Sequence, residues 1–84
     1  MCKLNLIEIN GDIEQFSATY QDCEGAQGVV TITKNGTNYN LIGNNTAGEN
    51  FETDIEIIEA GINPTKVFKL VAKLLKKYLC PTCS

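Results

Sequence analysis

Hydrophobic and polar residues alternate along the first 58 positions with the two-residue period of β-strands. Five segments show this pattern, each with Asn, Gly or Asp next to at least one end: residues 3–9, 13–21, 29–34, 38–42 and 51–58. In the last of them Phe51, Thr53, Ile55 and Ile57 are expected to face a core, and Glu52, Asp54 and Glu56 to face water. Short connections favour pairing between successive strands. The pattern therefore predicts a five-stranded antiparallel β-meander.

Two local features refine this prediction. Within Lys3–Asn10 the alternation is imperfect, because Leu6 and Ile7 would lie on opposite faces although both are apolar. This indicates either a strand buried on both sides or a β-bulge near Leu6 and Ile7. The pair Asn35-Gly36 between two strand segments predicts the two central residues of a type I′ hairpin turn.

Residues 63–79 carry the period of an amphipathic helix. Asn63 suits the N-cap and Pro64 the first helical position, while Pro81 ends the helix. On a helical wheel, one half is apolar: Val67, Phe68, Leu70, Val71, Leu74, Leu75, Tyr78 and Leu79. The opposite stripe is basic: Lys66, Lys69, Lys73, Lys76 and Lys77. We expect one continuous helix across one face of the sheet, with Val71 and Leu74 fully buried.

These elements indicate a single small α+β domain: a meander over residues 1–62, a helix over 63–79 and a Cys-Pro-Thr-Cys-Ser tail over 80–84. With 84 residues and 43% hydrophobic composition, the chain can form one modest core. No stretch of about 18 apolar residues is present, and the start of the chain reads as a strand rather than as a signal peptide. A cytoplasmic location is therefore the simplest expectation.

The net charge of −3 hides a strong asymmetry. All ten acidic residues lie within residues 1–62, which contain only Lys3 and Lys34 as bases, whereas the last 22 residues contain five lysines and no acid. Charged faces of this kind usually serve solubility. The alternative is that Glu52, Asp54 and Glu56 form an acidic strand face that docks onto a basic partner.

The four cysteines are the candidate chemical site. Cys80 and Cys83 have a two-residue spacing that suits one metal ion, and the meander topology would bring Cys2 and Cys23 to the same end of the domain. A tetrahedral zinc site would need all four, since the chain has no histidine. A redox-active pair, two structural disulfides and four unconnected thiols are the alternatives. The motif follows a helix C-terminus, where the dipole does not lower a thiol pKa, and this weakens the redox alternative.

The absence of histidine also removes the usual nucleophile pairs and the commonest general base, so we do not expect an enzyme. The expected function is that of a small non-catalytic interaction protein of adaptor or inhibitor type, acting through its acidic sheet face on a protein with a basic surface. Nucleic acid is disfavoured because the lysine stripe contains no arginine and no interleaved aromatic residue. A membrane is disfavoured because the sheet requires the apolar half of the helix. Self-association remains open, and the alternative function is a thiol-redox protein or a carrier with a modifiable tail.

Overall fold

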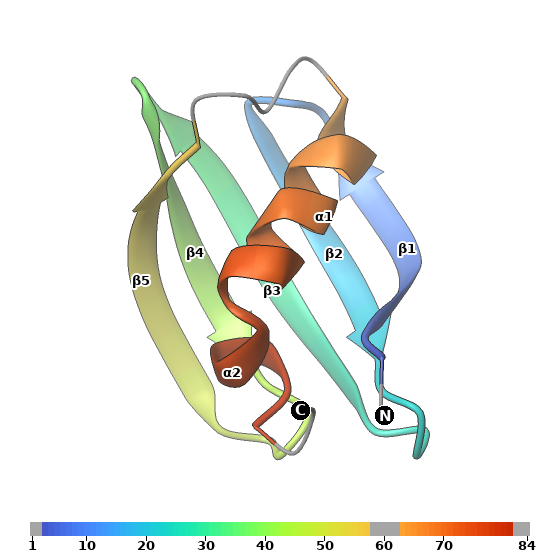
Figure 1. Ribbon diagram of the computed structural model, residues 1–84. Coiled ribbons are helices and arrows are strands. Elements are labelled where there is room, and N and C mark those ends of the chain that lie inside the picture. The colour runs from blue at the N-terminus through green and yellow to red at the C-terminus, as the bar shows by residue number, and fades with distance from the viewer. Residues whose placement is uncertain (1–2, 58–62, 82–84) are drawn as a thin grey trace.

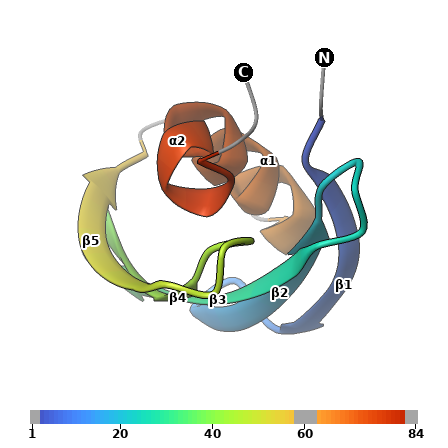
Figure 2. The same ribbon diagram turned by 90° about the horizontal axis from the view of Figure 1, so that it is seen from below.

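The computed structural model describes residues 3–57 and 63–81. Five antiparallel strands form one sheet in the order β1-β2-β3-β4-β5. Their bounds are Asn5–Gly11, Gln15–Gln21, Gln27–Asn35, Asn38–Asn44 and Asn50–Glu56, and the helices are α1 (Pro64–Leu74) and α2 (Lys76–Leu79). The sheet curves into a shallow trough with both helices on its concave side (Figures 1 and 2). The α+β meander with a C-terminal helix across one face is confirmed.

β1 contains the irregularity that the sequence indicated. Its register with β2 shifts between Leu6 and Glu8, so Ile7 is an extra residue without a partner opposite. The Ile7 side chain is 49% exposed, because the shift turns it away from the core. The β-bulge prediction is confirmed, and it explains why Leu6 and Ile9 both pack against the core.

The turn between β3 and β4 lies one residue later than predicted. Asn35 pairs with Asn38, so the two loop residues are Gly36 and Thr37. Gly36 has φ +67°, and no non-glycine residue in the described part of the chain has a positive φ. A type I′ turn needs two successive positive φ values, whereas a type II′ turn needs one, at a leading glycine. The type I′ prediction at Asn35-Gly36 is therefore wrong.

The core lies between the concave face of the sheet and the helices. Its central contact is a stacked pair, Tyr20 on β2 and Phe68 on α1, with ring centroids 6.0 Å apart. The Tyr20 hydroxyl crosses β3 and donates a hydrogen bond to the Asn44 carbonyl. Gly28 makes this crossing possible, since a Cβ there would lie 2.6 Å from the hydroxyl oxygen. Burial raises the pKa of Tyr20 well above its usual range, which keeps this donor protonated.

The helix begins as predicted but is interrupted. The Asn63 side chain caps it by accepting a hydrogen bond from the Thr65 N–H at 2.8 Å. α1 then ends at Leu74, Leu75 adopts φ −114° and ψ 27°, and α2 begins at Lys76. The 16-residue helix expected over residues 64–79 is therefore two shorter ones.

The interruption and the helical phase decide which apolar residues reach the core. Leu75 is 8% exposed and Val71 is fully buried, whereas Leu74 is 60% exposed and Tyr78 is 56% exposed. The buried stripe is centred on Val71 and Leu75, so Leu74 lies on the flank of α1 rather than beneath it. The predicted burial of Val71 is confirmed, and that of Leu74 is wrong.

Candidate functional site

The convex face of the sheet, which points away from the helices, is polar and acidic. Directly opposite residues on neighbouring strands share a face, and the register aligns Ser17, Thr31, Ile42 and Glu52 in one row across β2 to β5. Gln15, Thr33, Asn40 and Asp54 form a second row. Apart from Ile42, the residues that β2, β3 and β4 contribute to these two rows are serine, threonine, asparagine and glutamine, and among the described residues no lysine stands in either row.

Glu52, Asp54 and Glu56, called here the acidic ladder, line the β5 side of this face. All three are exposed, and they alternate with the half-buried Phe51, Thr53 and Ile55 as the sequence predicted. Asn40 Nδ2 donates to Asp54 Oδ1 at 2.9 Å, and this is the one side-chain hydrogen bond of the ladder to the described residues. Successive carboxylates on one face of a strand are roughly 7 Å apart. The ladder is therefore a concentrated and solvent-accessible negative charge.

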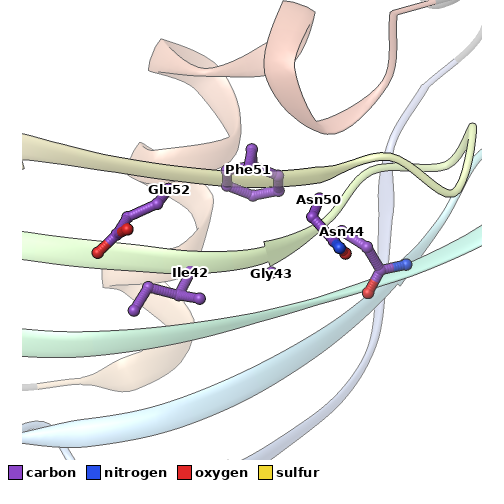
Figure 3. A pocket seen from close by; sticks show the side chains of 6 residues that line it. All are labelled: Ile42, Gly43, Asn44, Asn50, Phe51 and Glu52. Carbon is purple, nitrogen blue, oxygen red and sulfur yellow. The ribbon is translucent and has the colours of Figure 1, made fainter.

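A shallow, open hollow of about 540 Å³ adjoins the ladder (Figure 3). Its lining residues come from β4 and β5: Ile42, Gly43, Asn44, Asn50, Phe51 and Glu52. In Figure 3 the Ile42 and Glu52 side chains project from the convex side, whereas Phe51 projects toward the helices. Ile42 is 50% exposed and lies directly opposite Glu52, so an apolar side chain and a carboxylate stand side by side.

The basic residues lie on the other side of the molecule, on the helices. Lys66, Lys69, Lys73 and Lys77 are exposed, and Lys76 is half-buried. The helices lie on the concave side of the sheet (Figure 2), whereas the acidic ladder lies on its convex face, so the exposed lysines and the ladder are on opposite sides of the sheet. The charge asymmetry along the sequence thus becomes a charge separation in space.

The structure places the two cysteines that it describes near one end of the fold. Cys23 lies in the exposed turn between β2 and β3, and Cys80 follows α2; both segments lie at the end of the sheet where β1 begins (Figure 1). The Leu79 carbonyl accepts a hydrogen bond from the Thr46 N–H at 3.0 Å, which fastens the chain before Cys80 to the turn between β4 and β5. Cys80 is fully buried.

Cys23 and Cys80 are each disulfide-bonded. Cys2 and Cys83 lie outside the described residues, and the described residues contain no group of three or more His, Cys, Asp or Glu arranged to hold a metal ion. The zinc site over Cys2, Cys23, Cys80 and Cys83 stays a prediction. A sulfur in a disulfide is not a thiolate ligand, so such a site would require the reduced protein.

Two exposed apolar surfaces were missed from the sequence. One is Ile42, which strand alternation places on the polar face but which looks like a core residue by type. The other is the exposed apolar flank of α1 at Leu74, which only the position of the helix on the sheet reveals. For Ile42 the signal was present, since it alternates with Leu41.

Comparison of the chain with protein-family models, curated proteins and solved structures finds no match. Among the helices that the structure describes, none is both long and apolar enough to cross a membrane.

Proposed function

We propose that this protein is a small non-catalytic interaction module that binds a basic segment of another protein through its acidic ladder. The observation that carries the proposal is the ladder itself: Glu52, Asp54 and Glu56 project in one line from a regular strand, and all three are exposed. Isolated surface charges contribute little to affinity, but a row of like charges attracts an oppositely charged partner and orients it.

The hollow beside the ladder suits lysine or arginine side chains in particular. These side chains bury their aliphatic stems on apolar surface while the charged head stays near water or a carboxylate. Ile42 offers the apolar surface, and Glu52, directly opposite on the neighbouring strand, offers the carboxylate. A basic side chain lying across β4 and β5 would therefore make both contacts at once.

The separation of charge supports the same proposal. The lysines of the helices lie on the concave side of the sheet, so the sheet separates them from the acidic ladder. Salt screening further weakens their effect on the potential of the ladder. A basic partner is attracted to one side of the molecule and repelled by the other. This favours one binding orientation.

The test is co-purification from an extract of the source organism, with the bound protein identified by mass spectrometry. The variant reverses the ladder by Glu52→Lys, Asp54→Lys and Glu56→Lys. The control reverses three exposed carboxylates elsewhere, by Glu8→Lys, Glu14→Lys and Glu24→Lys, and changes the net charge by the same amount. The proposal expects one basic protein that the native chain and the control retain and that the ladder variant loses.

Retention of the same partner by the ladder variant at about 150 mM salt would contradict the proposal. Equal loss in both variants would also contradict it, because binding would then depend on net charge rather than on the ladder. Thermal unfolding of each variant checks that the fold is intact.

The cysteines support a structural role better than a catalytic one. A redox-active cysteine is partly exposed and has a lowered pKa, whereas Cys80 is fully buried and disulfide-bonded. Disulfides persist in oxidising compartments, so these bonds count against the cytoplasmic location expected from the sequence, which stays a prediction. Alkylation without reductant separates the possibilities: bonded Cys23 and Cys80 remain unlabelled, whereas a zinc protein treated with chelator takes up label at all four cysteines.

A further inference from the structure

Among residues 3–57 and 63–81, no strand pairs with the outer edge of β5, which is the last strand of the sheet. Asn45 N–H donates to the Glu49 carbonyl across the turn that joins β4 and β5. Hydrogen-bonded pairs alternate with non-hydrogen-bonded pairs along an antiparallel ladder. Counting from this pair, Phe51, Thr53 and Ile55 point their backbone groups toward β4. Glu52, Asp54 and Glu56 point theirs toward the free edge.

The residues whose side chains form the acidic ladder are therefore the residues whose backbone N–H and C=O groups are available at the edge. A strand added there in antiparallel pairing would place one of its side chains directly opposite each carboxylate, with Cβ atoms about 5 Å apart. The register of β4 with β5 has no shift, so this edge offers a seven-residue template without a bulge.

A second copy of the same strand is a poor occupant of this edge. In any antiparallel pairing of two β5 strands through their edge-facing residues, carboxylates of one copy lie opposite or diagonal to carboxylates of the other. Like charges directly opposite each other destabilise a strand pair. The charge of the edge instead complements a strand with lysine or arginine at alternate positions.

The concave side of the same edge is apolar and incompletely covered. Phe51 and Ile55 are only partly buried. On α1, Ala72 lies beside Leu4 near β1, so the opposite flank, which carries Leu70 and Leu74, faces β5. Leu74 is 60% exposed there. The alternate side chains of an added strand would cover this surface.

We infer that β5 binds an extended segment of its partner by β-augmentation, with basic side chains over the acidic ladder and apolar side chains over Phe51, Ile55 and Leu74. This inference rests on the proposed function and adds the binding mode and the sequence pattern of the partner. Main-chain hydrogen bonds supply affinity in such complexes, and alternating side chains supply specificity.

The test uses a labelled seven-residue peptide, Lys-Val-Lys-Thr-Lys-Val-Lys with blocked ends, and a peptide of the same composition with its four lysines consecutive. Fluorescence anisotropy at about 50 mM salt measures both affinities. We expect the alternating peptide to bind at least tenfold more tightly. Amide exchange of the native protein should then slow at Glu52 and Asp54 on binding, and not at Thr53, whose N–H already faces β4.

Two substitutions at one position separate charge from backbone. Glu52→Gln and Glu52→Pro remove the same carboxylate, but only proline also removes the edge N–H. We expect Glu52→Gln to weaken the alternating peptide about twofold to fivefold and Glu52→Pro to weaken it at least tenfold further. Equal losses, equal affinity for both peptides, or no detectable binding up to about 1 mM would overturn β-augmentation, while the co-purification experiment still decides the proposed function.

Amide exchange is measured on the native protein with and without peptide, so its result does not depend on whether the Glu52→Pro variant folds. Unchanged exchange at Glu52 and Asp54 with saturating peptide would overturn it. Sedimentation equilibrium tests the rival occupant: a dimer that Glu52→Pro abolishes would overturn the choice of a basic partner in favour of a second copy.

Discussion

The two edges of the sheet are protected in different ways. β1 has a bulge at Ile7 that interrupts its register, and edge strands with bulges are poor templates for another strand. β5 is regular along its whole length and carries three carboxylates instead. A bulge disfavours pairing with any added strand, whereas carboxylates disfavour only strands that carry negative charge. We therefore expect β1 to resist an added strand and β5 to accept only a strand with basic side chains.

The flanks of α1 differ in the same sense. Toward β1, Leu4 and the half-buried Ala72 lie together with Lys3, Lys73 and Lys76 around a small hollow. Toward β5, Leu74 is exposed and the inner face of the strand is only half-buried. The helices thus cover the core near β1 and leave apolar surface exposed near β5.

The largest expected effect is a difference in stability between substitutions at two adjacent leucines of the helical segment, the buried Leu75 and the exposed Leu74. Leu75→Ala should lower the free energy of unfolding by about 2–5 kcal/mol, because Leu75 is buried in the core. Leu74→Ala should change it by less than about 0.5 kcal/mol, because Leu74 is on the exposed β5 flank. Urea unfolding measures both. A cost at Leu74 comparable with that at Leu75 would mean that this flank is covered by the protein's own chain.

The next largest effect is expected from removing backbone N–H groups of β5, which face either β4 or the outer edge of the sheet. Thr53→Pro removes an N–H that faces Leu41 of β4, whereas Asp54→Pro removes one that faces the free edge. We expect Thr53→Pro to destabilise the protein by about 1–3 kcal/mol more than Asp54→Pro, since it leaves a backbone partner unsatisfied. Thermal unfolding checks this. Equal destabilisation would show that the edge groups of Asp54 are already paired.

Removing the bulge should open the edge of β1. Deletion of Ile7 would bring Leu6 and Ile9 into regular alternation and make β1 a straight strand bearing a single acid, Glu8. We expect the variant to self-associate as its concentration rises, and the native protein to do so less, in sedimentation velocity. The matched control is Ile7→Thr, which keeps the bulge and reduces the exposed apolar surface. If the deletion variant stays as monomeric as the native chain, the bulge is not what closes this edge.

The smallest effect concerns charge repulsion within the ladder. Asp54 has a carboxylate roughly 7 Å away on either side, within the Debye length at physiological salt. Asp54→Asn should therefore stabilise the protein by a few tenths of a kcal/mol at low salt, and the gain should fade in about 1 M salt. Glu8→Gln on β1 serves as the control without such neighbours. A salt-independent gain at Asp54 would point to a cause other than repulsion.

Local sequence patterns predicted the five strands and the C-terminal helical segment in their correct order, but not the division of that segment at Leu75. Period-two alternation located all five strands, and the N-cap at Asn63 located the start of the helix, because these signals depend on residues near one another in the chain. The sequence also indicated an irregularity at Leu6 and Ile7, because these two residues cannot both face one core in a regular strand. It left a bulge and a strand buried on both sides as alternatives, and the structure shows the bulge. The exposure of Glu52, Asp54 and Glu56 followed from the same alternation.

The tertiary structure alone decided which part of each apolar surface became core. The helical wheel placed both Leu74 and Leu75 on the apolar half, and Leu74 was predicted to be fully buried. The position of α1 on the sheet instead buried Leu75 and left Leu74 exposed. The backbone N–H and C=O groups of Glu52 and Asp54 point away from β4. This orientation depends on the register of β5 with β4, which the turn at Asn45 sets. Register and helix position result from packing between distant segments, and no local pattern contains them.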